Sequence, residues 1–183
     1  MTQFEFVLVF ISIVVAFAVS DILSSWGEQI RLRRRVRRYD LHTAWSVMLL
    51  FVMMQVWWSL WSLSDLDAWT FSRYMALVVP FLTLALMAYI LTPNLDESDS
   101  DIRSHHFDIH RWFFSLGAFY LASWAFYSYV VLGYPINEPG SAYRFVGIGL
   151  MMALALWSKE RVHMAAAALA YVLMGAWLVA AVF

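Results

Sequence analysis

The sequence predicts an all-α polytopic membrane protein, a single bundle of six transmembrane helices joined by short loops, with both termini on the periplasmic side. Hydrophobic residues make up 63% of the 183-residue chain and charged residues 14%, and the mean hydropathy is +0.68. Soluble domains are only about 45–50% apolar. Several apolar runs have about 20 residues, the length of helix that crosses a hydrocarbon core. Six of the 12 basic residues stand in one short segment between two such runs.

The first predicted span covers residues 4–26. A signal peptide begins with a positively charged region. The residues before this span include Glu5 but no Lys or Arg. We therefore expect a retained helix rather than a cleaved leader.

The segment QIRLRRRVRRYD follows, in the predicted loop 27–40, and residues 41–63 form the second predicted span. Lys and Arg beside a span stay on the cytoplasmic side during insertion, and each gains about 1 kcal/mol from anionic lipid there. We therefore expect anionic lipids as partners and no nucleic acid, because the rest of that side is acidic. The expected lipid-binding residues are Arg31, Arg33, Arg34, Arg35, Arg37 and Arg38.

The remaining predicted spans are 71–91, 112–132, 142–158 and 162–183, and the other cytoplasmic loops are 92–111 and 159–161. In this arrangement ten basic residues lie inside, and only Arg73 and Arg144 lie outside. That bias predicts the stated orientation. The chain is predicted to be one transmembrane domain. Gly149 and Ala153 in the fifth span have the spacing of small residues that lets helices approach closely.

One polar stripe lies in the inner half of the first span. Asp21, Ser25 and Glu28 recur at helical spacing, with Ser24 beside them. An ionisable residue at membrane depth indicates a functional or ion-linked site. The alternative is a helix end whose polar groups reach the interface. Gln55 is a further candidate, because it is one of few polar groups in the middle of the predicted bundle.

The histidines invite a cofactor hypothesis. His42, His110 and His163 fall at the cytoplasmic ends of three spans, where two of them from different helices could ligate a haem. Interfacial histidines without a ligand are the alternative, because the imidazole ring is amphipathic. His105, His106, Asp108 and His110 could bind a metal, but His106 and His110 lie one helical turn apart only if their loop is helical. The alternative is a soluble, pH-sensitive loop. We expect no cofactor and no metal.

A charge cluster is predicted at the outer rim, from Glu5, Arg73 and Arg144. Each opens an odd-numbered span, and an unpaired charge at that depth is costly. Glu5 is therefore expected to pair with one of the arginines. The alternative is an outer mouth that attracts an anionic ligand.

The stretches FEFVLVFISIVVAFAVSDIL, LHTAW and QVWWSLW resemble those of small, uncharacterised multi-pass proteins of the bacterial inner membrane. The resemblance covers mainly the first seventy residues. It implies a bacterial inner-membrane location and carries no catalytic residues.

No phosphate-binding, dinucleotide-binding, zinc-protease or nucleophile-elbow motif occurs in the sequence. We therefore expect no enzyme, but a non-catalytic oligomeric scaffold or accessory subunit with anionic-lipid contacts, either as a homo-oligomer or with a partner membrane protein. The alternative is a small channel or solute transporter. Haem-linked electron transfer is a third hypothesis.

Overall fold

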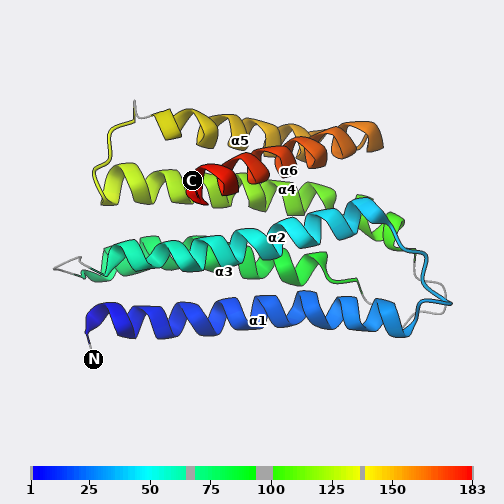
Figure 1. Ribbon diagram of the computed structural model, residues 1–183, viewed down its shortest axis with the longest axis horizontal. Helices are drawn as coiled ribbons and strands as arrows, with labels where there is room; N and C mark the ends of the chain where they lie inside the picture. The colour runs from blue at the N-terminus through cyan, green and yellow to red at the C-terminus, as the bar shows by residue number, and fades with distance from the viewer. Residues whose placement is uncertain (1, 65–68, 94–100, 137–138, 183) are drawn as a thin grey trace.

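The computed structural model describes residues 2–64, 69–93, 101–136 and 139–182, and these residues are helical apart from short connections and caps (Figure 1). The helices are α1 (Gln3–Arg31), α2 (Asp40–Ser59), the 3₁₀ helix η1 (Leu60–Leu63), α3 (Phe71–Leu91), α4 (Ile102–Phe126), the π-helix η2 (Tyr127–Val131), α5 (Pro139–Leu156) and α6 (Glu160–Val182). The all-α prediction is confirmed.

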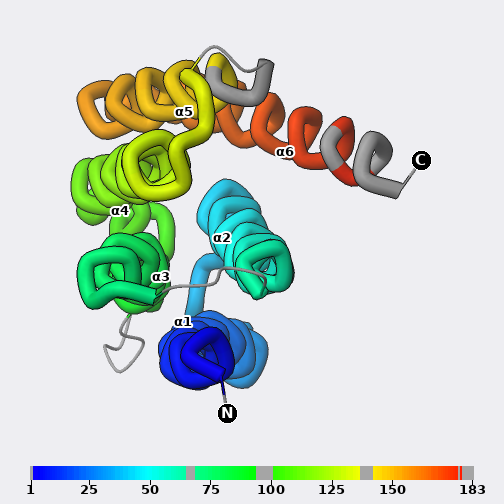
Figure 2. Tube along the Cα trace, turned by 90° about the vertical axis from the view of Figure 1, so that its left-hand side faces the viewer, coloured from blue at the N-terminus to red at the C-terminus, as the bar shows by residue number. Residues whose placement is uncertain are grey.

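Consecutive α-helices run in opposite directions along the long axis of the molecule (Figure 1). Viewed from one end, α1, α3, α4 and α5 form a row, and α2 and α6 lie on one side of it (Figure 2). Helix α1 packs on α3, α3 on α4 and α4 on α5, while α2 packs on α1, α3 and α6. The loops after α1, α3 and α5 therefore share one end of the bundle.

Four of these helical segments are long and apolar enough to cross a membrane: Gln3–Arg31, Asp40–Leu63, Phe71–Leu91 and Ile102–Val131. A shorter apolar helix covers Ala142–Leu156. Length and composition thus indicate a membrane protein, since in hydrocarbon a lipid-exposed backbone must satisfy its own hydrogen bonds.

The predicted loop 92–111 is wrong in its second half, because α4 begins ten residues earlier than the predicted span. The carboxylate of Asp101 accepts a hydrogen bond from the backbone N–H of Arg103 at 3.1 Å and caps the helix. Ile102, His106 and His110 are buried on one face. Their i, i+4, i+8 spacing continues the packed face of the helix beyond its apolar part.

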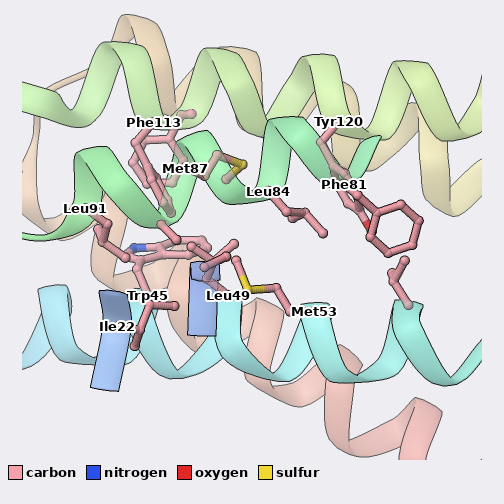
Figure 3. Packing of buried hydrophobic residues seen from close by; sticks show 14 of the residues in the cluster. Ile22, Trp45, Leu49, Met53, Phe81, Leu84, Met87, Leu91, Phe113 and Tyr120 are labelled. Carbon is pink, nitrogen blue, oxygen red and sulfur yellow. The ribbon is translucent and has the colours of Figure 1, made fainter. Parts of the chain in front are cut away.

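Large side chains of α2, α3 and α4 meet in the interior. Trp45, Leu49 and Met53 of α2 point toward Leu84, Met87 and Leu91 of α3 and toward Phe113 of α4 (Figure 3). The indole of Trp45 meets the ring of Phe114 edge to face, with 5.0 Å between ring centroids. Lipid tails are as apolar as these side chains, so close packing rather than exclusion of water stabilises such contacts in a membrane.

The close approach of α4 and α5 depends on glycines other than the predicted one. A Cβ added at Gly147 would lie 2.9 Å from Cδ1 of Leu121, and one at Gly117 would lie 3.1 Å from Sδ of Met151. A Cβ at Gly149 would meet nothing within 4 Å. Gly149 was therefore wrongly expected to let helices approach, and Gly117 and Gly147 do so.

We predict that Gly147→Ile lowers the stability of the bundle by about 1–3 kcal/mol, because the added side chain overpacks the α4–α5 interface. Gly149→Ile is the matched control. It changes the helix propensity by the same amount, but its side chain enters open space. Thermal unfolding in detergent measures both. Equal melting temperatures for the two variants would contradict this account of the interface.

Candidate functional site

All five histidines of the chain meet at one end of the bundle. His42 lies in the first turn of α2, His105, His106 and His110 lie in the first turns of α4, and His163 lies in the first turn of α6. These three helices start at the same end because the chain reverses direction at every loop (Figure 1). We call these five residues the histidine cluster.

The imidazole rings form a row rather than a ring of ligands. In order along the row they are His105, His42, His106, His163 and His110. The successive ring centroids lie 5.8, 5.8, 5.7 and 5.7 Å apart, each pair edge to face. Phe107 and Phe114 pack against His163 from the side.

The cluster is buried, and much of its hydrogen-bonding capacity is unused. His42, His106 and His163 are at most 2% exposed, whereas His105 is half-buried. Nε2 of His163 pairs with the carbonyl oxygen of Trp157 at 2.7 Å, and Nδ1 of His110 pairs with that of Phe107. Both ring nitrogens of His106 and Nδ1 of His42 and His163 have no hydrogen-bond partner within the described part of the chain.

The structure brings together the three haem candidates, His42, His110 and His163, but in the wrong arrangement for haem. Two axial imidazoles need a flat space between them for the porphyrin, and here the rings touch one another and neighbouring phenylalanines. Within the described residues, no three His, Asp or Glu side chains are placed to hold a metal ion. What the row offers is a set of buried imidazole nitrogens without hydrogen-bond partners among the described residues.

Tyr39, Glu160 and Arg103 form a hydrogen-bonded group next to the histidine cluster. The hydroxyl of Tyr39 donates to Oε1 of Glu160 at 2.8 Å, and Arg103 forms a 2.8 Å ion pair with Oε2. The ring of Tyr39 also packs on His106, with 5.6 Å between centroids. Burial and the bond to Glu160 raise the pKa of Tyr39 to about 12. Hydrogen bonds from Arg103 and Tyr39 lower the pKa of the Glu160 carboxyl.

Sequence reasoning missed Tyr39, Arg103 and Glu160. Each lies at or near the start of an even-numbered helix, as His42, His106 and His163 do. That shared position was the available signal. It shows a common end of the bundle, but not which side chains converge there.

The arginine segment packs directly beside the histidine cluster. Val36 is buried against Ile102 at the start of α4, and the backbone of Arg37 forms a bridge with that of Asp101. The arginine side chains are exposed, and within the described residues only that of Arg31 makes an ion pair, with Glu28. The exposed and unpaired arginines are Arg33, Arg34, Arg35, Arg37 and Arg38.

The predicted polar stripe on α1 does not act as one unit. Ser25 is buried and accepts a 3.2 Å hydrogen bond from Nε2 of Gln29, which is also buried. Asp21 is half-buried and Ser24 is exposed. Glu28 pairs with Arg31. The buried pair Ser25–Gln29 was not predicted.

Two members of the predicted outer charge cluster, Glu5 and Arg144, belong to helices at opposite ends of the helix row. Glu5 forms a capping box with Thr2 at the start of α1. Arg144 belongs to α5, at the opposite end of the helix row from α1 (Figure 2), and its guanidinium lies over the ring of Tyr129. Glu5 and Arg144 therefore do not meet, because α3 and α4 separate their helices, and the pairing of Glu5 with at least one of the two arginines stays a prediction. Gln55 and Arg144 instead line one cavity.

Comparisons with protein families, with characterised proteins and with solved structures return no match for this chain.

We predict that His106→Leu leaves the melting temperature unchanged or raises it. The imidazole is 1% exposed, and its nitrogens have no hydrogen-bond partner among the described residues. A buried polar group without a partner destabilises the fold by about 1–3 kcal/mol. Removing the imidazole should regain this free energy and offset the loss of its ring contacts. His163→Leu is the matched control, and it should cost about 1 kcal/mol because it removes the bond to Trp157. Strong destabilisation by His106→Leu would show that His106 holds a partner in the membrane.

Proposed function

We propose that the protein is a six-span, non-catalytic component of the bacterial inner membrane, an oligomeric scaffold or accessory subunit whose cytoplasmic end binds anionic lipids. The histidine cluster and the arginine segment form that end. Helices α5 and α6 are the fifth and sixth spans in this proposal, and both termini are periplasmic.

The observation that carries the proposal is the exposure of five arginines next to the apolar helices. They stand on a segment that is anchored by Val36 and Tyr39 to α4 and α6. Because the segment is already anchored, it loses less conformational entropy when its guanidinium groups bind a ligand. Guanidinium groups form paired hydrogen bonds with phosphate oxygens, the group that lipid headgroups share.

A channel or small-solute transporter is the second candidate. A polar cavity at the end of the bundle opposite the histidines favours it. The core between the two ends is lined by side chains such as Trp45, Met53 and Phe81. That apolar packing gives no polar route through the described bundle, so the scaffold remains the better supported function.

We predict that changing Arg33, Arg34, Arg37 and Arg38 to Gln reduces the anionic lipid that co-purifies with the protein by at least about tenfold. Each basic residue contributes about 1 kcal/mol next to an anionic leaflet. The matched control changes the same four residues to Lys and should keep most of the lipid. Lipid extraction and mass spectrometry measure the retained classes.

If the Gln variant retained as much anionic lipid as the unchanged protein, the proposed lipid-binding role would be wrong. Tight binding of RNA or DNA at physiological salt, with a steep salt dependence, would replace it with nucleic-acid recognition.

We predict that reporter fusions after Ser64 and Ile136 read periplasmic and that a fusion after Pro93 reads cytoplasmic. The basic residues on the cytoplasmic side determine this orientation. A cytoplasmic signal after Ser64 would reverse the orientation. The same fusions in the Gln variant should give mixed signals, since that variant loses four of ten basic residues on that side.

A further inference from the structure

A polar cavity lies at the end of the bundle opposite the histidine cluster. Its volume is about 320 Å³, and residues of α2, η1, α4, η2 and α5 line it. This volume is at the lower end of the range of about 300–1,000 Å³ that small-molecule sites occupy. Three separate parts of the sequence, α2 with η1, α4 with η2, and α5, thus meet around one space large enough for a small ligand.

The π-helix η2 shapes one wall. The backbone N–H of Leu132 bonds to the carbonyl oxygen of Tyr127 at 3.0 Å, five residues back. The wider turn leaves the adjacent residues Tyr127 and Ser128 both buried, and both line the cavity. π-helical turns are rare and occur often at functional sites.

The cavity is lined by side chains that can donate hydrogen bonds. Tyr127 is 0% exposed, and its hydroxyl has no partner among the described residues. The half-buried Gln55 lines the same space, and its side-chain amide can donate hydrogen bonds. A buried phenol without a partner costs about 1–3 kcal/mol, which a bound acceptor would remove.

Among the described residues that line the cavity, Arg144 is the one charged side chain and none is acidic. The guanidinium carbon of Arg144 lies 5.5 Å from the ring centroid of Tyr129, which holds the group by a cation–π contact. The rings of Tyr120 and Trp124 add apolar walls.

We propose that this cavity binds a small amphiphilic anion through its oxyanion group, a carboxylate or a phosphate. Arg144 supplies the countercharge, and Tyr127 and Gln55 donate hydrogen bonds to the oxygens. The apolar part of the ligand lies against Tyr120 and Trp124. The oxyanion belongs either to a free organic acid or to a lipid headgroup, and both present the same chemistry to these donors. The inference is independent of lipid binding by the arginine segment.

The test uses the full-length protein in dodecyl maltoside, a detergent without charge, and 4-fluorobenzoate as the probe, observed by ¹⁹F NMR. Saturable binding is expected, and the neutral analogue 4-fluorobenzamide should bind at least tenfold more weakly. Arg144→Gln should weaken the binding of 4-fluorobenzoate at least tenfold, and Arg144→Lys should restore most of it.

The phenols give a matched pair of variants. Tyr127→Phe should weaken binding about three- to tenfold, whereas Tyr89→Phe should leave it nearly unchanged. Tyr127 lines the cavity, whereas Tyr89 is 70% exposed on α3 and does not line it. Each variant is first checked for an unchanged melting curve, so a folding defect is not mistaken for lost binding.

Added phosphatidylglycerol distinguishes the two sources of the anion. Displacement of 4-fluorobenzoate by this lipid, lost in Arg144→Gln, assigns the site to headgroups. Binding that phosphatidylglycerol does not displace assigns it to free acids. The proposal is overturned if 4-fluorobenzoate does not bind at millimolar concentration, if the amide binds equally well, or if Arg144→Gln has no effect.

Discussion

The alternation of helix direction is the constraint on which the rest of this structure depends. Hydrocarbon offers the backbone no hydrogen bonds, so each apolar segment forms a helix that satisfies its own groups. Short connections then require each helix to run antiparallel to the one before it. The starts of α2, α4 and α6 consequently share one end, and residues as distant as His42 and His163 come into one buried cluster.

The two ends of the bundle differ in chemistry because each collects the termini of different helices. One end holds the histidine cluster, the Tyr39–Glu160–Arg103 group and the arginine segment. The other holds a cavity with Arg144 as its charge and tyrosines and a glutamine as its donors. Between them lies packed apolar core, of which Trp45 and Met53 are central members (Figure 3). Packed apolar side chains therefore separate the two ends of the bundle.

Some elements followed closely from the sequence, and others did not. Helix α3 spans the predicted residues 71–91 because an apolar run is bounded by Thr70, which caps the helix, and by Pro93 shortly after its end. Helix α4 was predicted to begin ten residues late, because residues 102–111 carry charges and histidines that lower their hydropathy. Their buried face is still helical in period, as Ile102, His106 and His110 demonstrate. Hydropathy alone detects burial in lipid, but not burial against other helices.

The sequence by itself determined the helical fold, the apolar segments and the basic segment, because these follow from composition and from properties of consecutive residues. Only the tertiary structure decided which helices are neighbours. It placed α3 and α4 between Glu5 and Arg144, chose Gly147 over Gly149 as the point of close approach, and assembled five histidines into one row. The physical reason is that every apolar helix offers packing surface on several faces. The choice among them depends on side-chain shape across helices, which no local pattern in the chain encodes.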